Sequence, residues 1–194
     1  MPSEAVVRPW LVLPEWAGAI LQLAGLAGAA GLLRRASRPG TSGRIQLLVV
    51  GWLLAYFNSH ALAHWAVGRL GGIRFTGFGV HGTTVAAWYP PGLRSVMRHL
   101  PFWSARTEPA SRRAASPVAR AAMYVAGPLA TIAVSLGIPA YARTRGVPGA
   151  LVLLRGAGIW IAGMLFGELA PRSDLRRAFR ELRQAMGGRP HTHP

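Results

Sequence analysis

The segment from His60 to His64 combines residue types and a spacing that suit metal binding. The two histidines stand four positions apart in a long apolar run, and residues four apart lie on one face of a helix. Both imidazoles can therefore reach one metal ion, since imidazole nitrogen is a common metal ligand. The simpler alternative is a buried histidine pair that hydrogen-bonds to neighbouring helices. Asn58, close by in the same run, favours a polar site over that alternative.

The residue after the first histidine decides what such a site could catalyse. Zinc hydrolases with an HExxH motif place a glutamate there, which acts as the general base. Here Ala61 occupies the position. A general base typically contributes on the order of 100- to 10,000-fold to the rate, so ordinary hydrolysis is not expected. The chain has no cysteine, so any metal must be held by His, Asp or Glu.

The apolar runs that must position these histidines predict an α-helical integral membrane protein. At about 1.5 Å per residue, each run is long enough to cross most or all of a hydrocarbon core about 30 Å thick. The second run would carry His60 and His64 in its C-terminal half. The four expected transmembrane helices cover residues 16–33, 45–70, 121–142 and 147–170.

The net charge of +16 comes entirely from arginine, because the sequence has no lysine. Most arginines fall between and beyond the apolar runs, so anionic lipid headgroups are the expected partner and nucleic acid is not. The loops at 34–44 and 143–146 lie on one side of the predicted bundle. They hold fewer arginines than the segments on the opposite side, which are the N-terminus with Arg8, the loop at 71–120 and the tail from 171 onward. The positive-inside rule then predicts that both termini face the cytoplasm and that the inner leaflet contacts the basic side.

The segment between the second and third runs predicts two kinds of structure. Residues 73–89 show the alternating side-chain pattern of a strand, are rich in β-branched and aromatic residues, and contain a Gly turn. These features indicate a membrane-associated β-hairpin. Residues 92–117 mix arginine with Pro, Ser and Ala and predict a basic, weakly structured loop. His99 in that loop is expected to be solvated.

The C-terminal part predicts an amphipathic helix and supplies carboxylates. From Ser173 onward apolar residues share one face, so residues 173–194 are expected to form a cytoplasmic helix and tail on the membrane surface. Residues 1–175 form the membrane domain. Glu168 lies near the end of the fourth run and Asp174 follows that run, so both emerge at the same end as the histidines. Asp174 could be a third ligand or a helix-start residue, and Glu168 a ligand, a base or an arginine partner.

In order and spacing these motifs resemble the site-2 protease family of intramembrane zinc metallopeptidases. The resemblance runs from about Asn58 to Asp174. It rests on the HALAH helix, the Gly-Gly-Ile-Arg-Phe segment at 71–75, Ala-Gly-Pro-Leu at 126–129, and a last helix followed by Pro171 and an aspartate. The family implies a zinc held by His60, His64 and Asp174, a β-element that binds extended substrate, and cleavage of transmembrane segments.

The departures from the family pattern are as informative as the match. Ala61 replaces the base, Glu168 stands where the family has asparagine, and Asp174 comes about two residues early and precedes Leu175 rather than glycine. The leading hypothesis is therefore a pseudoprotease that binds a transmembrane protein or peptide, with its zinc retained or lost.

Two alternatives stay open at this point. The first is an active zinc protease with Glu168 or another carboxylate as base, since zinc alone can lower the pKa of bound water to about 7. The second is a histidine-box membrane oxidoreductase, with bis-histidine haem as a related option. His81 and His99 are the additional internal histidines, and neither forms a further box.

Overall fold

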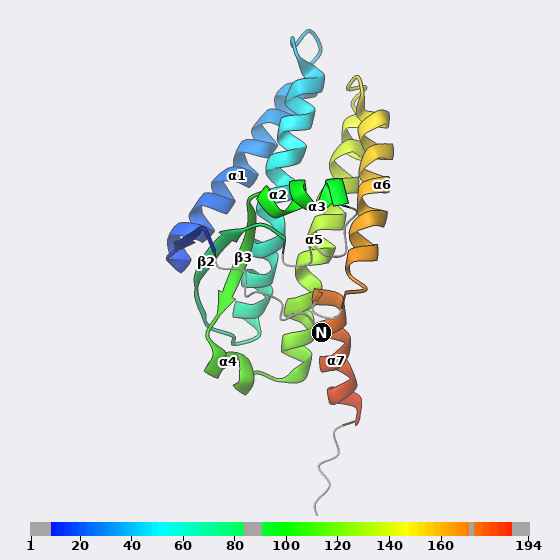
Figure 1. Ribbon diagram of the computed structural model, residues 1–194. Helices are drawn as coiled ribbons and strands as arrows, with labels where there is room; N and C mark the ends of the chain where they lie inside the picture. Colours follow the sequence, from blue (N-terminus) through cyan, green and yellow to red (C-terminus); the bar gives the residue numbers. More distant parts are fainter. Residues whose placement is uncertain (1–8, 84–90, 171–172, 188–194) are drawn as a thin grey trace, which may run out of the picture.

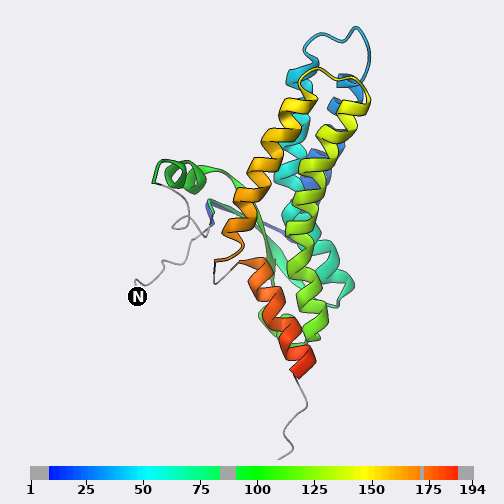
Figure 2. The same ribbon diagram turned by 90° about the vertical axis from the view of Figure 1, so that its right-hand side faces the viewer.

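The computed structural model describes residues 9–83, 91–170 and 173–187, and it is mostly helical (Figure 1). In the described residues, four long helices run side by side, a small sheet covers one side of them, and there are three shorter helices. Figure 2 shows that the helix at residues 91–99 stands away from the long helices.

Four of the helices are long and apolar enough to cross a membrane, and they match the predicted runs. They are α1 (Glu15–Ala36), α2 (Arg44–Leu70), α5 (Pro117–Thr144) and α6 (Ala150–Gly167). Only 22% to 39% of the residues in their most apolar windows are buried inside the molecule. Their outer faces are therefore apolar surface, which suits contact with lipid and indicates a membrane protein.

Helix α2 lies at the centre of the bundle. It packs against α1 on one side and α5 on the other, and α5 in turn packs against α6 and α7 (Asp174–Gly187). Near the turn between α1 and α2, Leu48 of α2 packs with Ala36 of α1 and Ala142 of α5, so the three helices are joined there. Arg44 donates from Nε to the Ala36 carbonyl at 2.7 Å and so closes the turn between α1 and α2.

The sheet has a different pairing from the one the sequence predicts. It is antiparallel, in the order β1 (Leu11–Leu13), β2 (Phe75–His81), β3 (Phe102–Thr107). The predicted strand at the start of 73–89 is present as β2. The predicted hairpin is wrong, because β1 and β3 take the two sides of β2; residues 84–90 lie outside the described residues. The competing partners come from distant parts of the chain, which local alternation does not reveal.

The region predicted as a weakly structured loop is ordered, which corrects that expectation. Residues 92–117 contain most of α3 (Pro91–His99), β3 and α4 (Pro109–Ala114). Backbone pairing explains the order: Glu108 donates its N–H to the Arg74 carbonyl at 2.8 Å, and its carboxylate accepts from Arg74 Nε at 2.7 Å. His99 is exposed and bonds within its own helix, to the Ser95 carbonyl.

The sheet is fixed against the helices by Phe78 of β2. This ring is fully buried and packs with Ala19 of α1 and with Ala61 and Leu62 of α2. Gly18 allows the approach, because a Cβ there would stand 2.8 Å from Phe78 Cβ. The sheet therefore lies beside the part of α2 that carries the histidines.

Helix α7 follows α6 and packs along the lower part of α5 (Figure 1). Ala178 is buried with Tyr124 and Met123, and Arg120 Nη2 lies 2.7 Å from the Glu181 carboxylate. The predicted amphipathic helix is confirmed to Gly187, while residues 188–194 lie outside the described residues. Much of its apolar face is exposed: Phe179 at 53%, Leu182 at 40% and Met186 at 78%.

Candidate metal centre

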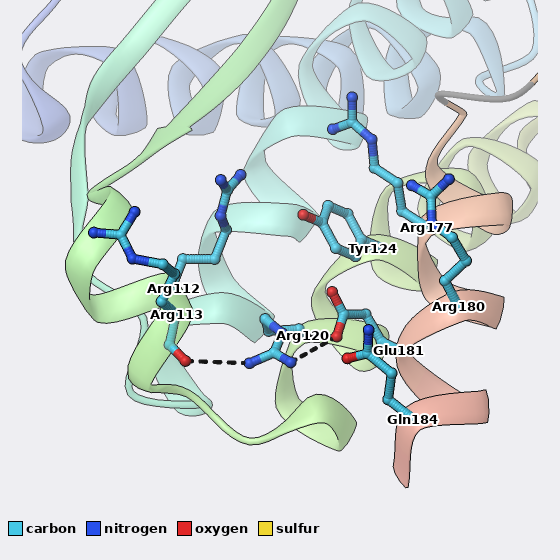
Figure 3. A pocket seen from close by; sticks show the side chains of 8 residues that line it. All are labelled: Arg112, Arg113, Arg120, Tyr124, Arg177, Arg180, Glu181 and Gln184. Atoms are coloured by element: carbon cyan, nitrogen blue, oxygen red, sulfur yellow. Dashed lines mark hydrogen bonds and ion pairs between the residues drawn. The ribbon is translucent and has the colours of Figure 1, made fainter. Parts of the chain in front are cut away.

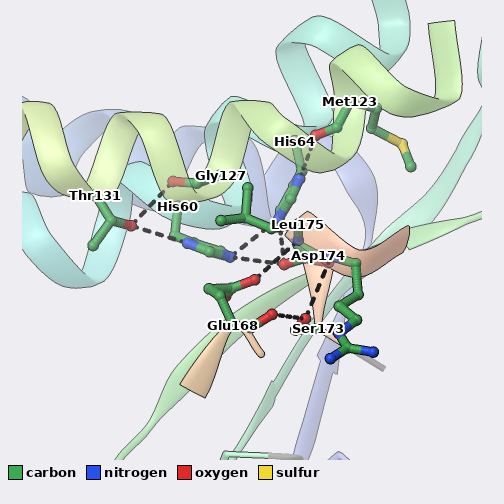
Figure 4. Close-up of polar contacts among 10 residues, drawn as sticks. His60, His64, Met123, Gly127, Thr131, Glu168, Ser173, Asp174 and Leu175 are labelled. Carbon is green, nitrogen blue, oxygen red and sulfur yellow. Dashed lines mark hydrogen bonds and ion pairs between the residues drawn. The ribbon is translucent and has the colours of Figure 1, made fainter. Parts of the chain in front are cut away.

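Three side chains from two distant parts of the chain converge at one point (Figure 4). His64 Nε2 lies 3.1 Å from His60 Nε2 and 3.1 Å from Asp174 Oδ2. The distance from His60 Nε2 to the same oxygen is 3.3 Å. Helix α2 supplies both imidazoles and the first residue of α7 supplies the carboxylate, as the sequence predicts.

These separations fit a shared metal ion. Tetrahedral ligands at about 2.0 to 2.1 Å from a zinc ion stand about 3.3 to 3.4 Å from one another. The observed spacings of 3.1 to 3.3 Å are close to that value. Two imidazole nitrogens and one carboxylate oxygen also form a sufficient catalytic-type donor set, with a fourth position left for another group. This group could therefore hold a metal ion.

The His64 ring is oriented by a backbone carbonyl of α5. Its Nδ1–H donates to Met123 O at 2.6 Å. A carbonyl can only accept, so the proton of the neutral ring is on Nδ1 and Nε2 carries a free electron pair. Such a bond on the far nitrogen is the usual way that proteins orient a metal-binding histidine.

The His60 ring is oriented by a side chain of α5. Thr131 donates its hydroxyl to the Gly127 carbonyl at 3.1 Å, so its oxygen accepts from His60 Nδ1–H at 2.9 Å. The hydrogen-bond network thus assigns the same tautomer to both rings. Thr131 is buried, with 3% of its surface exposed, so water does not compete for this contact.

With both ring protons on Nδ1, the two Nε2 atoms and the Asp174 carboxylate form a cluster of electron pairs with no proton between them. Two Nε2 lone pairs and one carboxylate oxygen of Asp174 face each other at hydrogen-bond distance, and their ring protons are used elsewhere. Such a cluster requires a cation, either a proton on one nitrogen or a metal ion. A proton joins only two of the atoms, whereas the three nearly equal spacings suit an ion that contacts all of them.

Gly127 of α5 provides the space in front of the rings. A Cβ at this position would stand 2.8 Å from His60 Nε2 and still closer to His64 Nε2. Any other residue would therefore fill the place that a ligand of the two nitrogens needs. This explains the glycine of the Ala-Gly-Pro segment in physical terms.

Asp174 is both a helix-start residue and part of the cluster, so the two sequence-based alternatives are compatible. It opens α7, where Ser173 before it donates its hydroxyl to the Ala170 carbonyl at 2.8 Å. Burial raises the pKa of the Asp174 carboxyl. Without a metal ion, a proton on the Nε2 side of His60 or His64 supplies the hydrogen bond and positive charge that outweigh burial, so the pKa lies well below its usual range.

Glu168 lies beside the cluster but has another bonding role. Its Oε2 accepts from the Leu175 N–H at 2.9 Å and so caps the start of α7. Burial raises the pKa of this carboxyl, partly opposed by the Leu175 N–H. Glu168 borders the same cavity as the three converging residues, so it stays close enough to act on a molecule bound there.

Ala61 and Asn58 face away from the cavity. Ala61 is 0% exposed and packs with Ala19 and Phe78. Asn58 donates to the Leu54 carbonyl at 2.8 Å and lies against Gly25 of α1. The sequence placed Asn58 near the histidines, but the structure uses it in the contact between α1 and α2.

The three converging residues open on a cavity of about 400 Å³. One wall is the edge strand β3, five of whose six residues line it. The other walls include residues of α2, α5, the end of α6 and the start of α7. His81 also lines the cavity, where its Nδ1 bonds the Gly82 carbonyl at 2.6 Å.

No family model, no curated protein and no solved structure matches the chain.

Two residues of the site were not found from the sequence, Met123 and Thr131, and Gly127 was identified only as part of the Ala-Gly-Pro-Leu motif. Met123 acts through its backbone carbonyl and so leaves no side-chain signal. Thr131 follows Gly127 by one helical turn, and a buried hydroxyl at that spacing in an apolar helix is the signal that could have identified it.

Proposed function

We propose that this chain is a site-2-protease-like membrane protein that holds a zinc ion through His60, His64 and Asp174 and binds a peptide segment beside it without ordinary proteolysis. The observation that supports the metal most strongly is the convergence of two Nε2 lone pairs and one carboxylate oxygen at 3.1 to 3.3 Å. The lost base supports the absence of proteolysis.

The role of each residue follows from its contacts. A bound zinc ion would polarise a carbonyl oxygen or lower the pKa of water. His60 and His64 hold their Nε2 atoms toward the ion because Thr131 and Met123 bind their other nitrogens. Asp174 supplies the negative charge that favours a dication. No carboxylate at position 61 takes up a proton, because the side chain there is a methyl group buried against Phe78.

The cavity supports peptide binding. Strand β3 pairs with β2 on one side and lines the cavity with residues from Phe102 to Thr107. An edge strand offers backbone N–H and C=O groups to an added extended chain. Tyr56 and Phe57 border the cavity from α2 and would contact apolar side chains. An extended segment of a membrane-spanning protein is therefore the proposed partner.

The placement in the membrane belongs to the same proposal. The four apolar helices would cross the bilayer, with α7 and both termini on the cytoplasmic side. The exposed apolar residues Phe179 and Met186 of α7 and the neighbouring arginines would then contact the anionic inner leaflet.

Metal content tests the proposal directly. Protein purified in detergent is analysed for bound metals, as wild type and as His60→Ala, His64→Ala and Asp174→Ala. The matched control is His99→Ala, which removes an exposed histidine outside the site. About one zinc per chain is expected in wild type and control, with large losses in the other three. Equal metal content in all five proteins would reject the site.

A second candidate is an active zinc protease with Glu168 as the base. The observation in its favour is that Glu168 borders the cavity beside Asp174. Cleavage of single-span substrates by wild type and its loss in Glu168→Gln, with zinc content unchanged, would support this candidate and reject the pseudoprotease. Zinc binding with no cleavage of the same substrates supports the binding role.

A further inference from the structure

A second pocket, about 490 Å³ in volume, lies between α4, α5 and α7 and is strongly basic (Figure 3). Figure 3 shows Arg112 and Arg113 of α4 on one side, Arg177 and Arg180 of α7 on the other, and Arg120 between them. The described lining residues include five arginines and one carboxylate, that of Glu181.

The single carboxylate is already neutralised. Glu181 Oε2 accepts from Arg120 Nε at 2.8 Å and lies 2.7 Å from Arg120 Nη2. Arg120 is held further by the Arg113 carbonyl at 3.4 Å. This ion pair joins α5 to α7 and forms the floor of the pocket. This pair accounts for one arginine and for the one carboxylate among the described lining residues, so arginines stay in excess and the pocket has a positive potential.

One of these arginines is held in a defined position. The Arg177 guanidinium lies 5.7 Å from the centre of the Tyr124 ring, a cation–π contact that holds the group without neutralising it. Planar guanidinium groups from two facing helices suit a tetrahedral oxyanion, because each can offer two N–H donors to it. A phosphate group is the common biological anion of this kind.

The position along α5 places the pocket at the depth of lipid headgroups. Arg120 precedes Thr144 by 24 positions, a rise of about 36 Å at 1.5 Å per residue. A hydrocarbon core about 30 Å thick that begins near Thr144 would therefore end before Arg120. The pocket then lies where the phosphates of one leaflet, and anions of the adjacent water, are both within reach.

We infer that the pocket formed by Arg112, Arg113, Arg120, Arg177 and Arg180 is a binding site for a phosphate group, carried by an anionic lipid headgroup or by a soluble phosphate. The site is separate from the metal centre and does not depend on it. The two are neighbours, however, since Arg112, Tyr124 and Arg177 line both the pocket and the metal-site cavity.

The test measures the thermal unfolding midpoint of the full chain in neutral detergent at constant ionic strength. Three probes are titrated separately: dihexanoyl phosphatidic acid, dihexanoyl phosphatidylcholine and inorganic phosphate. A saturable rise with phosphatidic acid alone identifies a lipid headgroup, and a rise with inorganic phosphate as well identifies a general phosphate site. Both results support the inference. No saturable rise with either anionic probe would overturn it.

Matched variants separate the pocket from general surface charge. Arg113→Gln/Arg180→Gln removes two pocket guanidinium groups, and Arg106→Gln/Arg183→Gln removes two that do not line it. The pocket variant should bind about tenfold more weakly or worse, while the control binds as wild type. Equal weakening in both variants would overturn the inference. Arg113→Gln alone, which changes one exposed side chain, gives the same comparison should the double variant unfold.

Discussion

Gly127 of α5 lies directly against His60 of α2, so close that a Cβ at Gly127 would stand 2.8 Å from His60 Nε2. The two residues are far apart in the sequence, and their contact sets the space in which an ion could meet the histidines. The α2–α5 interface is therefore part of the site as well as part of the bundle.

Gly127→Ala should abolish metal binding. The added methyl group would occupy the space in front of both Nε2 atoms, and overpacking of this kind typically costs about 1 to 3 kcal/mol. The measurement is zinc per chain together with the unfolding midpoint. Gly163→Ala is the control, because a Cβ at Gly163 meets nothing within 4 Å. Normal zinc content in Gly127→Ala would contradict the placement of the ion.

Thr131→Val should weaken metal affinity by about 10- to 100-fold, the usual effect of removing a hydrogen bond that orients a ligand. The valine keeps the shape of threonine but removes the oxygen that accepts from His60 Nδ1–H. Thr131→Ser, which keeps the hydroxyl, should stay near wild type. Competition with a zinc chelator measures the difference, and equal affinity in Val and Ser variants would show that the hydroxyl does not orient His60.

The sequence predicted the parts of the fold that depend on local composition. Long apolar runs correspond to α1, α2, α5 and α6, and the spacing of His60 and His64 placed them on one face. The convergence with Asp174 was also predicted, because helix direction fixes which ends meet. The apolar runs and the histidine spacing are patterns within one helix. The convergence follows from helix direction, because α2 and α6 run the same way and their C-terminal ends lie at the same end of the bundle (Figure 1).

The sheet could be predicted only in part, since strand pairing is a property of distant segments. Alternation identified β2, but its partners β1 and β3 lie more than 20 residues away on either side. β3 was hidden in a segment rich in Arg, Ser and Pro, whose order comes from contacts such as that of Glu108 with Arg74. The orienting carbonyl of Met123 is likewise invisible in the sequence, because every residue has one.

The ionised Asp174 should stabilise the protein at neutral pH when metal has been removed. Because its pKa is lower in the folded chain than in the unfolded one, the unfolded chain binds the proton more readily. The stabilisation is therefore complete above an unfolded pKa of about 4 and declines as pH falls below it. Unfolding midpoints of metal-free wild type and Asp174→Asn should converge as the pH is lowered. A constant difference across the acid range would contradict this assignment.

Ala61→Glu should destabilise the protein and fail to restore proteolysis. The Ala61 side chain is fully buried against Ala19 and Phe78, so a carboxylate there would lose its hydration without a partner, at a cost of about 2 kcal/mol or more. The unfolding midpoint and cleavage of single-span substrates are measured together, with Ala61→Gln as the uncharged variant of equal size. A stable Ala61→Glu protein that cleaves substrate while Ala61→Gln does not would show that the glutamate reaches the cavity. The missing base would then account for the difference in cleavage between Ala61→Glu and wild type.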